Sequence, residues 1–330
     1  MTDNINTLKK IELKGLWGEV DIDWELDPKV NILIGKNGVG KTTLINLIYE
    51  ISNKIHEIEQ KAIKYVKFNN IKLIYSNNTS ITVGYNMEFS WEPNIGTYRK
   101  NLCMFDKIST FELLLEELEQ RKTLALIKGK LHPKIRTELD LVLLDLIDEY
   151  KNYQLKLRNK ERSAINKLEK KIKNLSLKDS AKKAELQELQ LLIKNKDKKI
   201  TEIYQQQQTL IDNINILFAD FGKTFAFDKE NAITFYKNKQ EITAYQLSSG
   251  EKQLLIILLT IILQENKPCV VLMDEPEISL HLSWQLDLIE IMQKLNPNAQ
   301  LIIATHSPAI FTRGWKDKIV RMEDITSTAS

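Results

Sequence analysis

The sequence is poor in cysteine and has no long hydrophobic run. Its two cysteines, Cys103 and Cys269, are far apart and match neither a CxxC pair nor a zinc-ligand spacing, which favours a reducing compartment. The longest apolar stretch, residues 254–263, is interrupted by Thr260 and is far shorter than the ~20 residues that cross a bilayer. The first residues contain no apolar segment of a secretory signal. We therefore expect a cytoplasmic protein without a membrane segment.

Glycine and proline are missing from a long internal segment. None of the 11 glycines and 7 prolines falls between Pro133 and Gly222, which favours long helices. Apolar residues recur there in alternating steps of three and four, with Lys196 and Gln207 at two skipped positions. They are Leu186, Leu189, Ile193, Ile200, Ile203, Leu210, Ile214 and Leu217, and upstream Ile165, Leu168, Ile172 and Leu175. With a turn at residues 176–180, the pattern predicts an antiparallel coiled-coil hairpin. Its arms of about 30 residues would project roughly 45 Å. A compact helical bundle is the alternative.

The charge of the chain is unevenly distributed. The net charge is only +3, yet residues 151–200 hold 16 Lys and Arg against 6 Asp and Glu. Clusters of Lys and Arg are what phosphate binding needs, so this segment is a candidate for direct contact with DNA. The alternatives are a dock for an acidic protein and an ordinary solvated surface of a coiled coil.

Both ends of the chain predict strands, and the C-terminal part adds helices. Residues 8–34 contain three strand-like runs, and residues 71–75 and 81–91 continue them, the second run with strict alternation. After Gly222 come three short strands, then a helix at 250–264, a strand at 270–273, a helix near 281–295, and strands at 301–304 and 318–322. The alternation of strands and helices implies a mostly parallel sheet flanked by helices.

A glycine-rich loop follows the predicted strand VNILI. Residues 35–42, GKNGVGKT, fit the pattern GxxxxGK[ST] and open a helix at 43–51, which is the context that this phosphate-binding motif requires. Backbone N–H groups at the positive end of the helix would surround the phosphates, while Lys41 would neutralise their charge and Thr42 would bind Mg²⁺. The predicted nucleotide contacts are Gly35, Asn37, Gly38, Gly40, Lys41, Thr42 and Thr43. The motif therefore predicts ATP and Mg²⁺ as cofactors.

A second apolar run, CVVLM, ends in two acids. An aspartate at the end of such a strand lies beside the phosphate loop, so Asp274 is predicted to hold Mg²⁺. The next side chain points the other way, and Glu275 is suited to polarise a water for in-line attack on the γ-phosphate. Alone, such a pair is more often a charge pair at a helix N-terminus. With a phosphate loop in the same chain, it predicts a hydrolytic site.

The segment LSSGEKQ, residues 247–253, starts a long apolar helix about 20 residues before the acid pair. It resembles the signature motif of the ABC ATPase superfamily, and the order of phosphate loop, signature, acid pair and histidine resembles that superfamily as well. The resemblance implies that His306, in ATHSP, contacts the γ-phosphate and that residues 277–281 form the D-loop. It also implies that a second subunit binds the same phosphate through its own Ser248, Ser249, Gly250 and Glu251, so that ATP joins two copies head to tail. We expect a homodimer or a higher even-numbered homo-oligomer.

Within the superfamily the chain is similar to the SMC/RecF/OLD-like branch. This assignment rests on SSGEK, DEPEISLH, ATHSP and the helical insertion, which is far too long for a usual transporter subunit. More narrowly, LSSGEKQLLIILLTIILQ, MDEPEISLHLSWQ, LNPNAQLIIATHSPAIF and GWKDKI look like the stand-alone ATPases of bacterial anti-phage systems such as PARIS and Septu. Such ATPases sense an invader and restrain or release a separate nuclease effector.

The sequence differs from other ATPases of this superfamily in three respects. Repair ATPases with a zinc hook carry CxxC at the apex of the coiled coil, and residues 173–182 have no cysteine. No acid cluster of a TOPRIM nuclease follows His306. The Q-loop glutamine is unplaced, because residues 105–111, where it is expected, contain none.

Together these observations predict an α/β fold: an ABC ATPase head, with a mixed β-lobe and a mostly parallel sheet, interrupted by a helical or coiled-coil hairpin. We expect the head in residues 1–105 and 216–330 and the insertion in 106–215. The first hypothesis is an ATP-driven switch in anti-phage defence, whose partner is a separately encoded effector, with Gly314 and Trp315 as a candidate dock. The alternative is an SMC/RecF-like ATPase of DNA repair or chromosome maintenance that binds DNA directly.

Overall fold

The computed structural model of the chain contains two units, one formed by residues 1–127 and 264–330 and the other by residues 128–263. It describes residues 7–53, 66–84, 89–92, 104–109, 137–176, 183–228 and 232–329. The second unit includes residues 216–263, which the sequence assigned to the ATPase head. These residues group with the helical insertion because helix α5 (Ser249–Leu263) contacts both long helices of that insertion.

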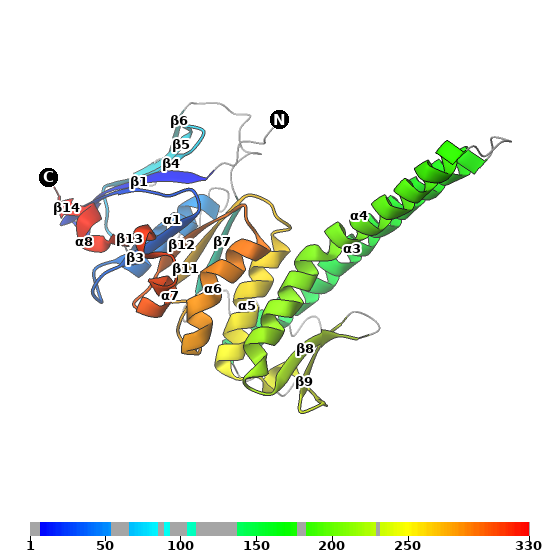
Figure 1. Ribbon diagram of the computed structural model, residues 1–330. Coiled ribbons are helices and arrows are strands. Elements are labelled where there is room, and N and C mark those ends of the chain that lie inside the picture. The colour runs from blue at the N-terminus through cyan, green and yellow to red at the C-terminus, as the bar shows by residue number, and fades with distance from the viewer. Residues whose placement is uncertain are drawn as a thin grey trace, which may run out of the picture. The chain divides into compact units, whose positions relative to one another are not determined.

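A parallel sheet of five strands forms the centre of the first unit (Figure 1). Its strands, in spatial order, are β13 (Ile319–Arg321), β3 (Val30–Ile34), β12 (Ala299–Ala304), β11 (Cys269–Asp274) and β7 (Met104–Ser109). All neighbouring pairs are parallel, which confirms the mostly parallel sheet. The sequence did not predict β7, which occupies part of the segment where the Q-loop was expected. The central strands β3, β12 and β11 are mostly apolar because both of their faces are covered, and their polar residues are Asn31, Gln300 and Asp274.

An antiparallel sheet forms the second layer of this unit. Its strands, in spatial order, are β14 (Thr326–Thr328), β2 (Val20–Glu25), β1 (Leu8–Leu16), β4 (Asn70–Tyr75), β5 (Ser80–Gly84) and β6 (Phe89–Glu92). The prediction of one strand over residues 81–91 was wrong. Its two halves pair antiparallel, with Ile81 opposite Trp91. Within β5 the predicted alternation of apolar residues holds, because Ile81 and Val83 are both buried.

Helix α1 (Lys41–Asn53) shares one core with both sheets. Buried side chains of α1, such as Leu44 and Ile48, lie in the same cluster as Trp24 of the antiparallel sheet and Leu272 of the parallel sheet. Helices α6 (Leu282–Leu295), α7 (Pro308–Thr312) and α8 (Met322–Ile325) also belong to this unit, and α6 contacts α7. The predicted helices at 43–51 and near 281–295 are confirmed.

Gln300 joins the two sheets of the first unit. Its side chain is fully buried in β12, where its Oε1 accepts a hydrogen bond from the backbone N–H of Leu8 at 2.8 Å. Its Nε2 donates to the carbonyl oxygens of Leu8 and Asp27, both at 2.8 Å. One amide therefore satisfies three backbone groups, which would otherwise lose their partners inside the protein.

Gln300→Leu should lower the free energy of unfolding by about 2–4 kcal/mol, because it leaves buried backbone groups unpaired. Urea unfolding followed by tryptophan fluorescence measures this change. The matched control is Gln293→Leu, which removes a half-buried glutamine with one backbone hydrogen bond. Equal losses in the two variants would contradict the bridging role of Gln300.

The second unit is a two-helix hairpin with a small sheet at its base (Figure 1). The hairpin consists of α3 (Glu138–Ser176) and α4 (Lys183–Ala219), and the sheet of β8 (Lys223–Phe227), β9 (Ile233–Lys237) and β10 (Gln240–Ile242). Each arm is longer than the predicted 30 residues, at 39 and 37 residues. Most of the turn predicted at 176–180 lies outside the described residues.

Among the residues whose burial the structure describes, the seam between the two long helices is fully buried near the base. Leu210 and Ile214 of α4 are fully buried there, and α4 also contacts β8. Farther out, Ile193 is 49% exposed, so its predicted place in the seam was wrong. Two helices alone cover only a narrow stripe of each other, whereas the base adds α5 and β8 to the packing.

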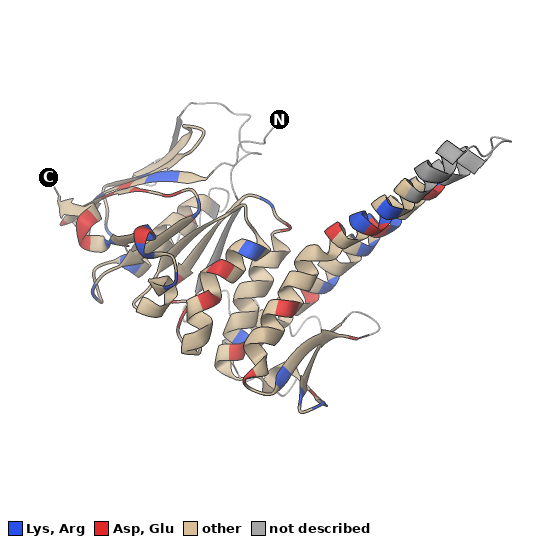
Figure 2. Cartoon of the chain, viewed as in Figure 1, with Lys and Arg blue, Asp and Glu red and all other residues tan. Residues whose placement is uncertain are grey.

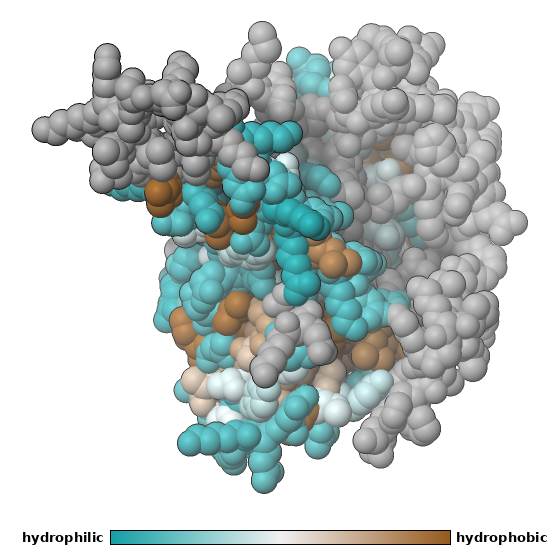
Figure 3. All heavy atoms as spheres, turned by 90° about the vertical axis from the view of Figure 1, so that its right-hand side faces the viewer, coloured by the Kyte–Doolittle hydropathy of each residue, from teal (hydrophilic) through white to brown (hydrophobic). Residues whose placement is uncertain are grey.

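The described surface carries a few exposed large hydrophobic side chains. On the face drawn in Figure 3, the hydrophobic residues lie among hydrophilic ones. Those exposed are Trp17, Leu155, Leu191, Ile193, Ile216, Phe221 and Leu282. Among the described helices, none combines the length and the hydropathy needed to cross a bilayer.

Candidate functional site

Three strands of the parallel sheet end side by side at their carboxyl ends. Leu33 of β3 pairs with Ala304 of β12, and Ala304 pairs with Asp274 of β11. The loops that follow these strands carry the predicted phosphate loop, His306 and Glu275, respectively. In parallel sheets, ligands bind outside this edge, so the register brings the predicted residues of the first unit to the usual place for a site.

The phosphate loop has the backbone that its glycines allow. Gly38 has φ +80° and Gly40 has φ +102°, a region that other residues adopt only with strain. A Cβ on Gly38 would touch nothing within 4 Å, whereas one on Gly40 would lie 2.8 Å from the ring of Trp17. Trp17 therefore packs on the loop, a contact that the sequence did not predict. The exposed segment of Asn37 and Gly38 leads into the N-terminus of α1, which fits an anion.

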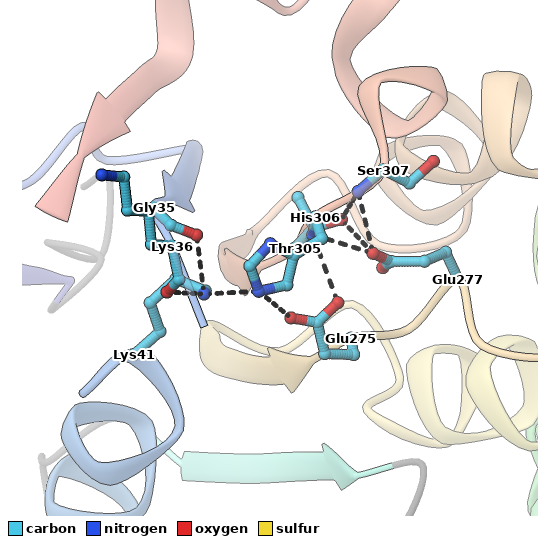
Figure 4. A network of polar contacts seen from close by, with 8 residues as sticks. All are labelled: Gly35, Lys36, Lys41, Glu275, Glu277, Thr305, His306 and Ser307. Carbon is cyan, nitrogen blue, oxygen red and sulfur yellow. Dashed lines mark hydrogen bonds and ion pairs between the residues drawn. The ribbon is translucent and has the colours of Figure 1, made fainter. Parts of the chain in front are cut away.

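Lys41 is buried and points back along the loop (Figure 4). Its ammonium donates to the carbonyl oxygens of Gly35 and Lys36 at 3.0 and 3.2 Å, and lies 2.7 Å from Nε2 of His306. Burial lowers the pKa of Lys41, and the charges of Glu275 and Asp274 oppose that shift. Burial and the charge of Lys41 lower the pKa of His306, which favours a neutral imidazole that accepts the hydrogen bond from Lys41.

Glu275 lies against the histidine in a strained backbone conformation. Its φ of +47° is unusual for a residue with a side chain, and such strain clusters at functional sites. Its carboxylate oxygens lie 3.3 Å from Nε2 of His306 and accept the His306 backbone N–H at 3.2 Å. Burial, with the hydrogen bond and the charge of Glu277, raises the pKa of Glu275 to about 8. The site thus holds a carboxyl group whose proton affinity suits acid–base work near neutral pH.

Glu277 holds the histidine loop in place, a role that the sequence did not predict. One oxygen of this buried carboxylate accepts hydrogen bonds from the Thr305 hydroxyl at 2.5 Å and from the backbone N–H groups of His306 and Ser307 at 2.9 and 3.0 Å (Figure 4). The Ser307 hydroxyl donates to Gln285 of α6 at 2.6 Å. The sequence placed Glu277 only at the start of the D-loop. Its position in the acidic segment DEPE, two residues after Glu275, was the available signal.

The predicted metal ligands lie in the same unit as the phosphate loop. Thr42 is exposed in the first turn of α1, and Asp274 is half-buried at the end of β11. A hydroxyl and a carboxylate are the hard oxygen ligands that Mg²⁺ prefers, and Mg²⁺ is commonly held by one or two protein groups together with phosphates. Among the described residues, no group of three or more His, Cys, Asp or Glu could hold a metal by itself. The residues present fit Mg²⁺ delivered with a nucleotide.

The signature residues belong to the second unit, whereas the phosphate loop belongs to the first. Ser248 and Glu251 form a reciprocal cap at the start of α5. The backbone N–H of Ser248 donates to Glu251 at 2.7 Å, and the backbone N–H of Glu251 donates to the Ser248 hydroxyl at 3.3 Å. Glu251 also pairs with Lys223 of β8 at 2.7 Å. Ser248 and Ser249 are exposed, whereas Gly250 and Glu251 are buried. Glu251 thus fixes the backbone at the start of the signature motif through contacts within the second unit.

A second buried ion pair fixes the next turn of α5. Lys252 lies 2.7 Å from Asp140 in the first turn of α3, and both side chains are more than 90% buried. Lys252 also donates to the carbonyl oxygen of Tyr245 at 3.3 Å. Breaking such a pair leaves a buried charge without compensation, so the base of the hairpin and the signature helix are held in one arrangement.

The remaining predicted segments have simple local roles in the structure. The imidazole of His281, at the end of the predicted D-loop, caps α6 through Ser283. Trp315 is half-buried and precedes a short 3₁₀ helix, and Gly314 is exposed with φ +87°. Their role as a dock for a partner stays a prediction, as does the D-loop assignment.

The chain matches one family of known proteins and is similar to two curated ATPases. A family profile described as "AAA domain, putative AbiEii toxin, Type IV TA system" matches residues 122–312. The "Retron Vc95 probable ATPase" of Vibrio cholerae serotype O1 biovar El Tor is 28% identical over 129 residues, which cover 36% of this chain and 25% of that protein. The "Retron Ec83 probable ATPase" of Escherichia coli is 35% identical over 85 residues, which cover 22% of this chain and 16% of that protein.

Solved structures share the fold. The SMC head bound to the C-terminal winged-helix domain of ScpA is similar with a TM-score of 0.52 at 13% identity, over 98% of this chain and 97% of that one. The predicted α/β ATPase-head fold is therefore confirmed, in its SMC-head form. Because the family match covers more than half of the chain, the protein belongs to the family described as "AAA domain, putative AbiEii toxin, Type IV TA system", and it has the fold of an SMC-like P-loop ATPase head.

Proposed function

We propose that the protein binds and hydrolyses ATP and uses the nucleotide state as a switch in anti-phage defence. The observation that carries this proposal is the cluster of Lys41, Glu275 and His306 at the carboxyl edge of the parallel sheet, beside a phosphate loop. The similarity to two retron ATPases supports the defence context, although it covers a quarter or less of their length. We also propose that the protein acts in the same way as the PARIS and Septu ATPases, which its sequence motifs resemble.

Each residue of the cluster has a proposed role. Bound Mg²⁺ would supply charge neutralisation at the phosphates, held by Thr42 and Asp274. The Lys41 ammonium pairs with phosphate oxygens, and His306 orients the terminal phosphate. Glu275 accepts a proton from the attacking water. Glu277 is a positioning residue that fixes the backbone of the histidine loop.

Glu275→Gln should reduce hydrolysis by a factor on the order of 10²–10⁴ while nucleotide binding persists, because the amide keeps the shape of the side chain but accepts no proton. Single-turnover assays with radiolabelled ATP measure both quantities. Glu290→Gln, an exposed change on α6, is the matched control and should behave as wild type. Undiminished turnover in Glu275→Gln would assign the base elsewhere.

We further propose that the site is completed by a second copy. Ser248 and Ser249 are exposed at a capped helix start, which suits them to meet a phosphate from outside their own unit. Two copies related by a two-fold axis would then form two equal composite sites. ATP in this arrangement binds the dimer more tightly than the separate chains, which is how hydrolysis would be coupled to assembly.

Mixing Lys41→Ala with Gly250→Val should restore activity that neither variant has. In a heterodimer one site carries both defects and the other is intact, so an equal mixture should recover roughly a quarter of the wild-type rate. Circular dichroism of each variant controls for folding, and native mass spectrometry confirms heterodimers. Heterodimers without recovered hydrolysis would contradict a shared site.

The proposed partner is a separately encoded effector that carries the destructive chemistry. The described residues offer a nucleotide site and no metal cluster for a nuclease. ATP-dependent contacts between two copies would shift the equilibrium of any partner that binds the two states differently. We therefore propose that the toxin activity named in the family description belongs to the assembly with the effector and not to this chain alone.

The purified chain should therefore leave single- and double-stranded DNA and RNA intact with Mg²⁺ and ATP, because its carboxylates serve the nucleotide. Gel assays with labelled substrates test this expectation, and a known nuclease is the positive control. Cleavage by the pure chain that disappears in Glu275→Gln would overturn the assignment of a separate effector.

A further inference from the structure

The two residues that would act at the terminal phosphate lie on separate segments of the first unit. Glu275 starts a turn, residues 275–280, in which the backbone N–H of Ile278 donates to the carbonyl oxygen of Glu275 at 3.2 Å. His306 lies in the loop after β12, residues 305–307. We name these segments the acidic turn and the histidine loop. Their relative position matters for hydrolysis, because a misplacement of about 1 Å can lower a rate by a factor on the order of 10².

Gln285 of α6 binds both segments at once. Its side chain is buried, and its Oε1 accepts a hydrogen bond from the Ser307 hydroxyl of the histidine loop at 2.6 Å. Its Nε2 donates to the carbonyl oxygen of Leu280 at 3.0 Å and lies 3.5 Å from that of Glu277, both in the acidic turn. One amide therefore links the segment of the proposed base to the segment of the proposed phosphate contact.

These partners require an amide at position 285. Carbonyl oxygens only accept hydrogen bonds, so the nitrogen of the amide has to face the acidic turn and its oxygen the histidine loop. A carboxylate of the same size would still accept from the Ser307 hydroxyl, but it would donate nothing to the two carbonyl oxygens. A leucine of similar volume would make none of these bonds.

Gln285 is a polar residue on the apolar face of α6. Its neighbours on this face, at spacings of three, four and seven, are buried apolar residues: Leu288, Ile289 and Met292. The charged residues of the helix lie on the opposite side, and their colours are visible on α6 in Figure 2: Asp287, Glu290 and Lys294. Burial of an amide costs free energy unless its hydrogen bonds are made. The two loops supply the bonds that offset this cost.

Glu277 adds a direct link between the same two segments. Its carboxylate accepts hydrogen bonds from the backbone N–H groups of His306 and Ser307 (Figure 4). That carboxylate belongs to the acidic turn itself, whereas Gln285 belongs to a helix whose apolar face is packed in the protein. The glutamine therefore holds both segments against an element outside them, which is how supporting side chains fix a site.

We propose that Gln285 is a positioning residue for hydrolysis, which fixes the acidic turn and the histidine loop at one separation. This inference rests on the proposed ATP hydrolysis and deepens it. Gln285 contacts neither the phosphate loop nor the proposed metal ligands through any of these bonds. It should thus act on the rate of the chemical step far more than on nucleotide affinity.

Steady-state hydrolysis and binding of a fluorescent, non-hydrolysable ATP analogue to the full chain test the proposal. Gln285→Leu should lower kcat roughly 10–100-fold, while KM for ATP and Kd of the analogue change by less than about threefold. Gln285→Glu keeps the size of the side chain and should lower kcat roughly tenfold, so it supplies the same test if Gln285→Leu does not fold. Hydrogen exchange followed by mass spectrometry should become faster in both the acidic turn and the histidine loop of Gln285→Leu.

Gln293→Leu is the matched control, because it removes a half-buried glutamine of the same helix whose amide donates to the carbonyl oxygen of Ala299, outside both segments. It should keep the wild-type kcat and the wild-type exchange of both segments. If the wild type hydrolyses ATP, an unchanged kcat or unchanged exchange in Gln285→Leu, or equal losses in Gln293→Leu, would overturn the role of Gln285 and leave the proposed hydrolysis intact. A wild-type chain that hydrolyses no ATP would overturn both.

Discussion

The register of three parallel strands is the constraint on which the site depends. Leu33, Ala304 and Asp274 are neighbours across β3, β12 and β11, so the three following loops begin at one level of the sheet. A shift of one residue in any of these strands would turn its side chains to the opposite face and move its loop away from the others. The buried apolar strands and α1 resist such a shift, because they share one core with the antiparallel sheet.

Much of this site could be predicted from the sequence, since its parts are local motifs in a recognisable context. The phosphate loop follows an apolar strand and opens a helix, and Asp274, Glu275 and His306 end or follow apolar strands. The structure places all of them in one unit. The proposed composite arrangement with Ser248 and Gly250 would involve a second chain, whose contacts the structure of one chain does not contain.

The features that the sequence did not reveal depend on contacts between distant segments. Glu277 accepts hydrogen bonds from a loop about thirty positions away, Gln300 bonds to Leu8 at the other end of the chain, and β7 finds its place beside β11. Periodicity also misled at Ile193, because a repeat of apolar residues does not show how far along a hairpin the partner helix covers it. Long-range packing decided each of these cases.

The surroundings of Lys41 have a consequence for how the loop chooses among anions. Its ammonium already has two carbonyl oxygens and an imidazole as partners, so its three N–H donors are already engaged within the protein. A chloride or a single phosphate has to compete with those partners and gains little by displacing them. A chain of phosphates reaches several loop N–H groups at once and offsets the exchange. If Lys41 turned to such a ligand, His306 would lose this donor, and its exposed imidazole would be able to form new contacts.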